Sequence, residues 1–430
     1  MNKILQIKLK ILAKLVLAKY KPKVVGVSGS VGKSSAKEAI HAVLSVKYRV
    51  RQNIKNYNNE IGLPLTILGA SSPGRSLLGW FLVFFKAFNL LLIKDKSYPE
   101  VLVLEMGIDR PGDMDYLLSI TKCDIGVITA IGQSHLEYFD SVDAIEKEKV
   151  KIIKNLKKDG TAVLNFDDER TDKIIKSLNN KILTFGFGKD AMLKAVEASH
   201  SFEKNKDIIN LKGINFKISY GGSVVPVLIP DALSQTTVYS GLIGATVGAI
   251  FDIDLIKISE ALRRLKMPPG RMNLINGIKH TLIIDDTYNS SPQSTRAALD
   301  TVSKLDIDKF NKKYAVLGDM LELGNISIKS HIEIGEYVVK SNINTLIVVG
   351  ERAVDIARGA ENAGMKKDYI FHFDDSEKAG KFVQDRINKG DLILVKGSQG
   401  VRMEKIVKEI MTEPLRAKEL LCRQDSQWRN

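Results

Sequence analysis

Hydrophobic positions in this chain cluster in short aliphatic runs, and stretches with helical spacing separate the runs. In the first half, each run is short enough to form one buried strand. These runs lie at residues 24–27, 101–104, 125–129 and 162–165. Strands that alternate with helices are joined by crossover connections. The pattern therefore predicts an α/β fold with a mostly parallel sheet and helices on both of its faces.

The alternation restarts after Met267-Pro-Pro-Gly-Arg271, a composition typical of a linker. The strand-like runs of the second half lie at residues 281–284, 314–317, 345–349 and 392–395. They predict a second, Rossmann-like α/β domain. We therefore expect an N-terminal helical segment at residues 1–22, a central domain at 23–274 and a C-terminal domain at 275–430.

Residues 3–20 combine lysines and aliphatic residues at helical spacing. Lys3, Lys10, Lys14 and Lys21 fall near one stripe of the predicted helix, and Leu5, Leu9, Leu12 and Val16 fall on another. Such a basic amphipathic helix can lie on an anionic membrane surface. It can equally cover a hydrophobic edge of the next domain, and the sequence leaves both interpretations open.

Residues 77–93 form an apolar insertion of 17 residues whose single charge is Lys86. Its length is at the short end for a bilayer span. Lys86 and Asn89 inside it argue against a transmembrane helix, and a span here would put neighbouring strands in different compartments. We expect a buried or interfacial helix, so residues 1–20 and 77–93 are the two candidates for peripheral membrane contact.

Composition narrows the class of protein. The hydrophobic share of 44% suits a globular chain, and two cysteines, Cys123 and Cys422, are too few for a disulfide framework. No secretory cleavage site follows the N-terminal apolar residues, so we expect a cytoplasmic protein. The net charge is +14, but residues 1–23 hold seven lysines and no acid. We therefore expect no nucleic-acid partner.

The most informative segment is 24–35, Val-Val-Gly-Val-Ser-Gly-Ser-Val-Gly-Lys-Ser-Ser, between a predicted strand and a helix at 36–44. Glycines at 26, 29 and 32 allow a tight turn with N–H groups close to an anion. Lys33 supplies a charge for the outer phosphates of a nucleotide, and Ser34 or Ser35 a hydroxyl for Mg²⁺. The glycine spacing is one residue longer than in the common P-loop. The alternative is a glycine-rich turn that binds no nucleotide.

Further candidates follow predicted strands, where parallel sheets bind ligands. Glu105 is placed to hold Mg²⁺, unless it is a solvated loop acid. His135 follows the next strand and is either a metal ligand or a hydrogen-bonded structural residue. In the second half, Asp286 follows the first strand and is a candidate for a ribose or a metal-bound water. With Arg271 just upstream, it suggests a nucleotide bound between two domains.

Several ordered motifs together resemble the Mur ligase family, and within it the MurF type, over residues 24–410. They lie at residues 26–35, 58–64, 105–107, 135–137, 165–168, 269–271, 285–289, 318–320 and 395–398. The resemblance implies a P-loop central domain that binds ATP and a Rossmann-like C-terminal domain. It also implies an enzyme of peptidoglycan synthesis, a ligase that adds D-alanyl-D-alanine to a UDP-N-acetylmuramoyl (UDP-MurNAc) peptide.

The resemblance further implies that ATP converts a substrate carboxylate into an acyl phosphate, which the incoming amine attacks. The implied catalytic residues are Lys33, His135, Lys149 and Arg271. The implied Mg²⁺ set is Ser34, Glu105, His135 and Lys149. Lys149 matches a lysine that is often carbamylated in the family. Because Lys147 is also a lysine, the sequence leaves open which of the two corresponds to it. The implied nucleotide contacts are Gly29, Ser30, Gly32, Lys33, Ser34, Ser35, Asn165, Arg271 and Asp286.

The chain departs from the family pattern at two points. Only about 23 residues precede the first strand, too few for the UDP-sugar-binding domain with which family members usually open. Residues 234–239, Ser-Gln-Thr-Thr-Val-Tyr, stand where an adenine contact is expected. Three functions therefore stay open: a MurF-type ligase acting as a monomer, a related ligase for a lipid-linked, folate or polyamide acceptor, and a non-catalytic nucleotide-binding scaffold.

Overall fold

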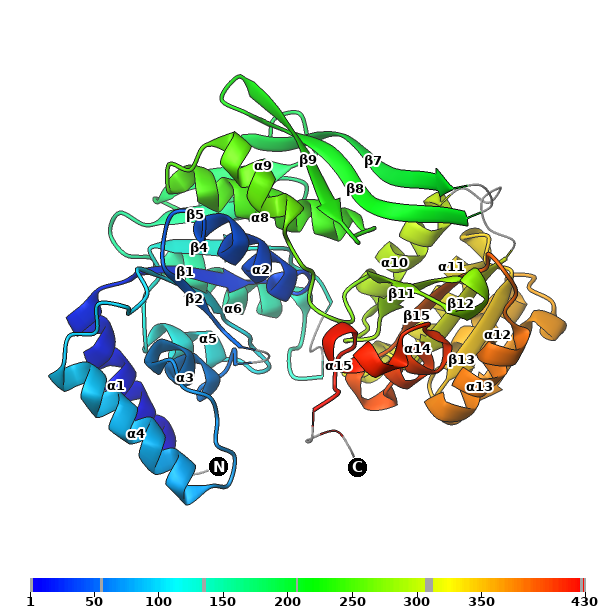
Figure 1. Ribbon diagram of the computed structural model, residues 1–430, viewed down its shortest axis with the longest axis horizontal. Helices are drawn as coiled ribbons and strands as arrows, with labels where there is room; N and C mark the ends of the chain where they lie inside the picture. The colour runs from blue at the N-terminus through cyan, green and yellow to red at the C-terminus, as the bar shows by residue number, and fades with distance from the viewer. Residues whose placement is uncertain are drawn as a thin grey trace.

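The computed structural model describes residues 3–54, 57–133, 137–205, 208–305, 312–425 and 428. Two sheets organise these residues, one in each half of the chain (Figure 1). The first has nine strands in the order β2-β3-β1-β4-β5-β6-β7-β8-β9, and the second has six in the order β10-β11-β15-β12-β13-β14.

The first six strands of the central sheet run parallel to one another, as the sequence predicts. Their bounds are β1 Lys23–Ser28, β2 Val50–Gln52, β3 Val101–Glu105, β4 Ile125–Ile128, β5 Thr161–Asn165 and β6 Lys181–Gly186. β1 lies between β3 and β4, so the strand order reverses beside it. The carboxyl end of β1 is therefore a topological switch point, where open α/β sheets bind ligands.

Three long strands extend this sheet and were not predicted: β7 Leu193–Asn205, β8 Ile208–Tyr220 and β9 Ser223–Pro230. They pair antiparallel with one another. Phe216 and Ile218 of β8 are buried, whereas Lys217 between them is partly exposed. This alternation is typical of a strand with one covered face.

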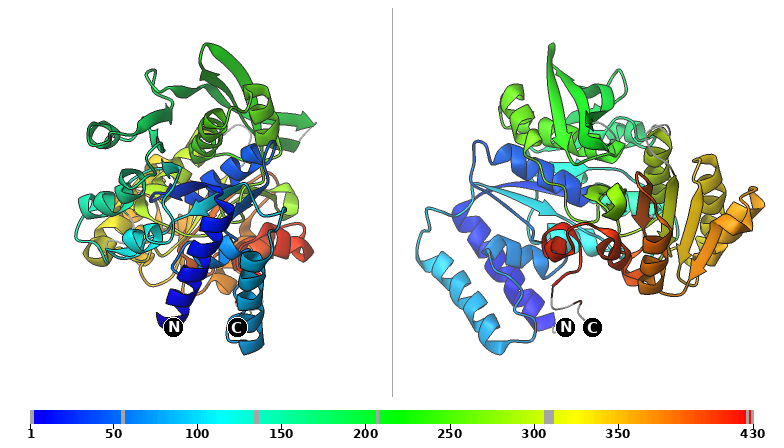
Figure 2. Two further views of the ribbon diagram at one scale, coloured as in Figure 1. Left: turned by 90° about the vertical axis from the view of Figure 1, so that its left-hand side faces the viewer. Right: turned by 45° about the vertical axis from the view of Figure 1, so that its right-hand side comes forward.

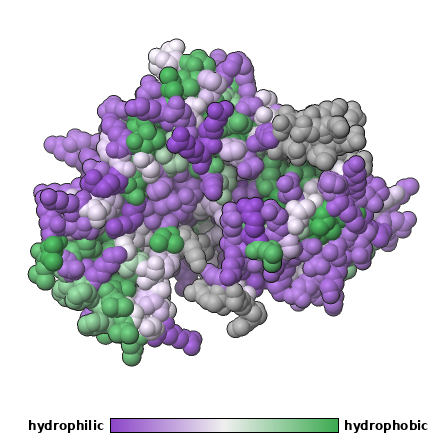
Figure 3. All heavy atoms as spheres, in the orientation of Figure 1, coloured by the Kyte–Doolittle hydropathy of each residue, from purple (hydrophilic) through white to green (hydrophobic). Residues whose placement is uncertain are grey.

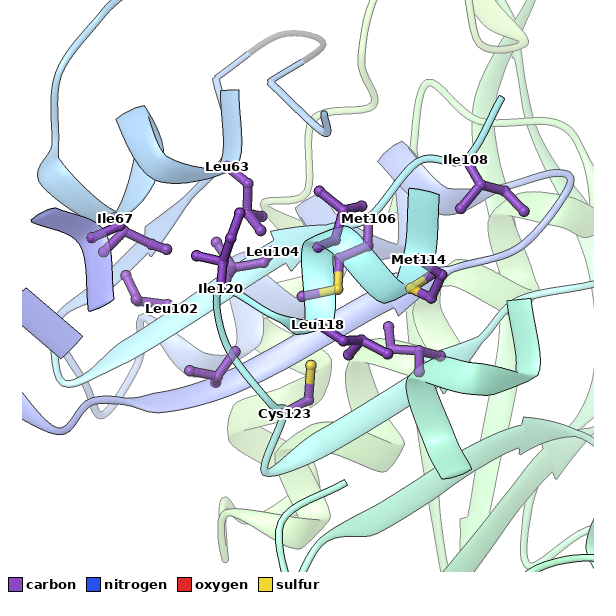
Figure 4. Close-up of a cluster of buried hydrophobic side chains, with 14 of the residues drawn as sticks. Leu63, Ile67, Leu102, Leu104, Met106, Ile108, Met114, Leu118, Ile120 and Cys123 are labelled. Atoms are coloured by element: carbon purple, nitrogen blue, oxygen red, sulfur yellow. The ribbon is translucent and has the colours of Figure 1, made fainter. Parts of the chain in front are cut away.

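Helices cover both faces of the central sheet (Figures 1 and 2). One face packs against α1 Lys3–Tyr20, α3 Gly62–Leu68, α4 Leu77–Leu92, α5 Asp113–Leu118 and α6 Val142–Lys154. The other packs against α2 Lys33–Leu44, α8 Gln235–Ile250 and α9 Leu255–Arg263. A short helix, α7 Thr171–Lys176, follows β5. Figure 4 shows part of the first core, where Leu63 and Ile67 of α3 lie close to Leu102 and Leu104 of β3.

Gly26 is part of this core and not of the phosphate loop. It lies inside β1, and a Cβ there would approach Cys123 Sγ to 2.4 Å and Ile152 Cδ1 to 2.9 Å. The sequence interpretation of Gly26 as a turn residue is therefore wrong. Its missing side chain makes room for neighbours in the core.

The C-terminal sheet is parallel except at its first strand. The strands are β10 Asn273–Asn276, β11 Leu282–Asp286, β12 Lys313–Gly318, β13 Thr345–Val349, β14 Ile370–Phe373 and β15 Leu392–Lys396. The helices are α10 Pro292–Lys304, α11 Ser327–Lys340, α12 Val354–Asn362, α13 Ser376–Arg386, α14 Glu404–Ile410 and α15 Ala417–Leu420. The two sheets confirm the predicted α/β class with a mostly parallel central sheet.

Candidate active site

The phosphate loop connects β1 to α2 and contains two glycines with positive φ, Gly29 at 147° and Gly32 at 83°. A Cβ on Gly29 would lie 2.0 Å from Thr129 Oγ1, so no other residue fits there without displacing β4 and the loop that follows it. Gly32 is the N-cap of α2 and offers no side-chain cap. The first N–H groups of this 12-residue helix are therefore left for an anion.

Hydrogen bonds to the segment after β4 fix the loop. The Ser30 N–H donates to Ala130 O at 2.7 Å, and Ser30 Oγ exchanges hydrogen bonds with the Gly132 backbone at 2.9 and 3.0 Å. Thr129 Oγ1 donates to Val31 O at 2.6 Å. The loop is thus held in one shape before any ligand arrives, which lowers the entropy cost of binding.

Two lysines meet beneath the loop. Lys33 Nζ and Lys149 Nζ donate to the same oxygen, Gly29 O, at 2.8 and 3.0 Å. Burial lowers the pKa of Lys33, although the nearby Glu105 carboxylate opposes this. Burial lowers the pKa of Lys149 much further, and repulsion from Lys33 adds to the effect. Lys149 is therefore suited to be an uncharged amine.

The structure also distinguishes Lys149 from its neighbour Lys147. Lys149 is 1% exposed on the face of α6 that carries Ile145 and Ile152, whereas Lys147 is exposed on the opposite side. Only Lys149 reaches the phosphate loop.

Glu105 ends β3 beside the start of α2. Its carboxylate accepts from Ser34 Oγ at 2.9 Å and from Asn58 Nδ2 at 3.1 Å, and its residue is 4% exposed. A hydroxyl and a carboxylate oxygen so close together are the kind of donors Mg²⁺ takes, alongside waters and phosphate oxygens. The donor set therefore fits Mg²⁺.

The structure does not show the other two predicted Mg²⁺ ligands, His135 and Lys149, beside Glu105. His135 lies outside the described residues, which hold no group of three or more His, Cys, Asp or Glu side chains arranged to bind a metal. The unmodified Lys149 amine donates its hydrogen bond to Gly29 O and not to the Glu105 carboxylate.

Asn53 was missed by the sequence reasoning. It is 1% exposed, and its side-chain oxygen accepts from the Glu105 N–H at 2.6 Å while its Nδ2 donates to Glu105 O at 3.3 Å. Asn53 thus fixes the backbone at the end of β3, from which the Glu105 side chain projects. No periodicity marks an isolated asparagine after a three-residue strand, so the sequence carries no signal for it.

The C-terminal domain presents a second charged cluster. Lys396 Nζ, at the end of β15, lies 2.6 Å from Asp286 Oδ2 and donates to Asn289 O at 2.9 Å. Burial lowers the pKa of Lys396, and Asp286 counteracts the shift. Arg271 stacks on the Tyr288 ring, with its Cζ 3.9 Å from the centroid. Tyr288 also holds the linker, because its N–H donates to Gly270 O at 3.1 Å.

Behind this cluster lies Asp285, which is fully buried. Its Oδ1 accepts from the Thr287 hydroxyl at 2.6 Å, whereas Oδ2 has no hydrogen-bond partner among the described residues. Burial raises the pKa of this carboxyl to about 7, against the opposing hydrogen bonds from Thr287.

A cleft of about 410 Å³ joins the two clusters. The predicted site residues that line it are Ser30, Gly32, Lys33, Ser34, Ser35, Glu105, Arg271 and Asp286. Gly29 and Lys149 lie directly behind this lining. Thr236 and Thr237, at the start of α8, line it as well. The structure thus gathers residues from both domains at one cleft.

Asn165, a predicted nucleotide contact, lies away from the lining of the cleft. At the end of β5, its side-chain oxygen accepts from the Asp167 N–H at 3.0 Å. Asp167 in turn accepts from the Tyr239 hydroxyl at 2.8 Å, and the Tyr239 ring meets Phe187 edge-on at 5.2 Å. Tyr239 was not singled out as a partner of Asp167, although both positions lie in segments the sequence had marked.

The chain is similar to known proteins over most of its length. The family model for the Mur ligase middle domain matches residues 87–223, and that for the Mur ligase, glutamate ligase domain matches residues 270–399. The Bacillus subtilis UDP-N-acetylmuramoyl-tripeptide–D-alanyl-D-alanine ligase is 33% identical over 404 residues, which cover 94% of this chain and 79% of that protein. The corresponding Escherichia coli ligase is 26% identical, covering 93% and 79%.

Solved structures of Mur ligases and a related ligase have a similar fold. MurF from Thermotoga maritima, in complex with ADP, superposes with a TM-score of 0.75 at 27% identity and covers 94% of this chain and 83% of its own. The Mycobacterium tuberculosis folylpolyglutamate synthase gives a TM-score of 0.63 at 15% identity, which shows a shared fold. On the identity, the coverage and the domain matches, the chain belongs to the Mur ligase family of ATP-dependent acid–amino acid ligases.

Proposed function

We propose that this chain joins D-alanyl-D-alanine to a UDP-MurNAc-tripeptide in the cytoplasm, at the expense of ATP. The observation that carries the proposal is the cleft in which the phosphate loop faces Arg271, Asp286 and Lys396. The named relatives support the choice of substrates, since the Bacillus subtilis ligase of that activity is 33% identical over 94% of this chain.

In the proposed reaction, a carboxylate oxygen of the tripeptide attacks the γ-phosphorus of ATP. The bond from that phosphorus to the β–γ bridging oxygen breaks, and ADP leaves. The uncharged amine of D-alanyl-D-alanine then attacks the carbonyl carbon of the acyl phosphate. The tetrahedral intermediate expels inorganic phosphate and loses a proton, which leaves the amide.

Phosphoryl transfer of this kind needs mainly positioning and neutralisation of charge. In our proposal the N–H groups at the start of α2 and the Lys33 ammonium hold the outer phosphates. Arg271 adds positive charge from the C-terminal side of the cleft. Ser34 and Glu105 would hold Mg²⁺, which when bound offsets phosphate charge. Lys396, held by Asp286, lies where it can orient the acyl phosphate or the amine substrate.

We further propose that Lys149 is carbamylated in the active enzyme. Its lowered pKa provides the free amine, whose nitrogen adds to the carbon of CO₂ and releases one proton. The product is an anion beside the Lys33 ammonium, so carbamylation adds an attraction that the neutral amine lacks.

The test is release of inorganic phosphate by purified protein supplied with ATP, Mg²⁺, UDP-MurNAc-tripeptide and D-alanyl-D-alanine. We expect release only when all are present, with L-alanyl-L-alanine as the matched inactive amine. Turnover with a folate or polyamide acceptor and glutamate instead would establish a different acceptor for the same chemistry. Binding of ATP without phosphate release for any acceptor and amine would overturn the ligase proposal and favour the scaffold.

A further inference from the structure

The helices α1 and α4 form a parallel pair at the edge of the central domain, away from the C-terminal sheet (Figures 1 and 2). Their C-terminal ends are fastened together. Lys19 Nζ donates to Leu90 O and Leu91 O at 2.9 and 2.8 Å, and the Tyr20 hydroxyl donates to Leu90 O at 3.0 Å. These hydrogen bonds hold the two helices together at that end.

Each helix of the pair is apolar on two sides. α1 buries Leu9, Leu12, Ala13 and Val16 against the domain, yet on the opposite side it exposes Ile4, Ile7, Ile11 and Leu15, each by 49–59%. α4 buries Val83, Ala87 and Leu90. Its opposite side exposes Leu77, Leu78, Phe81, Leu82, Phe85, Phe88 and Leu92, each by 56–86%. The space-filling view shows green at the position of this pair (Figure 3).

An exposed apolar face of this extent marks an interaction site. The charges around this face indicate which kind of partner binds it. Residues 1–23 carry seven lysines and residues 61–94 carry Arg75, Lys86 and Lys94, and neither segment contains an Asp or Glu. On α1 the exposed lysines lie on both sides of the isoleucine stripe, with Lys8 on one side and Lys3 and Lys14 on the other.

A basic groove of about 500 Å³ adjoins the C-terminal half of α1. Its cations are Lys14, Lys21, Lys23, Lys122 and Lys157. Its one carboxylate, Asp124, pairs with Lys23 at 3.1 Å and with Lys157 at 2.7 Å. Within the described ranges no carboxylate pairs with Lys14, Lys21 or Lys122, so the groove keeps an excess of positive charge.

We propose that the α1–α4 face is a peripheral membrane-binding surface that lies on a bilayer rich in anionic lipid. The apolar stripes enter the boundary between headgroups and acyl chains, and the flanking lysines and the groove attract lipid phosphates. α4 has 16 residues, or about 24 Å of helix, which is less than the hydrocarbon thickness. Consistently, none of the helices described has both the length and the apolar character to cross a membrane.

The test uses the full chain and vesicles of phosphatidylcholine, with and without phosphatidylglycerol, in a sedimentation assay that needs no substrate. We expect binding to the anionic vesicles and little to the neutral ones. Replacing Phe81, Phe85 and Phe88 by Ser should reduce partitioning by about tenfold or more, because the apolar contact is lost. K8Q and K14Q should each reduce it by about fivefold.

Matched controls carry the same changes elsewhere on the surface. I256S and V224S replace exposed apolar residues, and K257Q and K408Q exposed lysines, and all four should bind vesicles like the parent. If the triple serine variant does not fold, F85S alone and the shift of tryptophan emission on vesicles give the same information, provided that both are recorded with W428F so that Trp80 on α4 is the one emitter.

Four results would overturn the proposal. One is failure of the parent to bind anionic vesicles. A second is binding of the parent to neutral vesicles as strong as to anionic ones. A third is binding of the α4 and α1 variants equal to that of the parent. The fourth is a stable dimer in the absence of lipid that F85S dissociates, which would assign the face to a second copy of the chain. None of these depends on whether the ligase reaction proceeds.

Discussion

Lys33 Nζ and Lys149 Nζ share one acceptor, the carbonyl oxygen of Gly29, at 2.8 and 3.0 Å. Two ammonium groups on one oxygen would repel each other, and burial together with repulsion from Lys33 holds the pKa of Lys149 well below its ordinary value. Lys149 is therefore the uncharged member of the pair, and the partly buried Lys33 carries the charge. A nucleotide phosphate would pair with the Lys33 ammonium, and carbamylation would give Lys149 a negative charge beside it.

The first prediction concerns Lys33. K33A removes the ammonium beside the outer phosphates, so we expect turnover to fall by at least about 100-fold. The free energy of unfolding should not fall, because a partly buried charge disappears with the side chain. Phosphate release and urea denaturation measure the two effects. K257A, at an exposed position of α9, is the control, and near-normal turnover of K33A would contradict the assigned role.

Lys149 gives the second prediction. Removal of dissolved CO₂ should lower the activity of the parent, and bicarbonate should restore it. K149A should be inactive in both conditions, and added formate or acetate should restore part of its turnover by replacing the carbamate carboxylate.

The neighbouring variant K147A is the matched control, since Lys147 is exposed on the same helix. It should respond to CO₂ like the parent. Activity independent of CO₂ in the parent would refute carbamylation and leave Lys149 as a plain amine.

The third prediction concerns the metal. E105Q keeps the hydrogen bonds from Ser34 and Asn58 within reach but removes the negative charge, so the Mg²⁺ concentration needed for half-maximal activity should rise by about tenfold or more. A magnesium titration of phosphate release measures this. E169Q, at an exposed acid, should titrate like the parent. An unchanged titration of E105Q would exclude Glu105 as a ligand.

Asp285 leads to a fourth prediction, on stability. In the folded state its pKa is about 7, against 3.8 for an ordinary Asp carboxyl. From about pH 4 to 7 the folded protein therefore keeps a proton that the unfolded chain releases. The contribution of this group to the free energy of unfolding falls as pH rises through that window, by a few kcal/mol in all, and is lowest above pH 7.

D285N removes this titration and keeps an oxygen for Thr287. Urea denaturation at pH 8 should find the variant more stable than the parent, and at pH 5 about equal to it. A parent whose stability rises relative to D285N between these pH values would contradict the raised pKa.

Much of this site follows from the sequence for a physical reason. Strand runs at residues 24–27, 101–104 and 125–128 contain no polar side chain because both sheet faces are covered, and their ends meet at one edge. Even the choice between Lys147 and Lys149 was in the sequence. Lys149 is four residues after Ile145 and three before Ile152, both buried, and so shares their helix face.

Other features depend on contacts between distant segments. Gly26 looks like a loop glycine until Cys123 and Ile152 are seen against it. Asn53 acquires its role only when β3 brings Glu105 beside it. Residues 214–219 of β8 alternate apolar and polar side chains, but β9 is apolar after Ser223, and the length of all three strands is set by pairing with one another. Local patterns do not contain such information.

The contacts of Gly270 and Tyr288 have a consequence for motion. Gly270 has φ 73°, its carbonyl accepts from the Tyr288 N–H, and the next residue, Arg271, stacks on the Tyr288 ring. Although it precedes the C-terminal sheet, Arg271 is thus anchored to that domain. If the two domains hinge on the linker before Gly270, the guanidinium travels with the C-terminal domain. Its distance from Lys33 and the phosphate loop would then report directly how far the enzyme has closed.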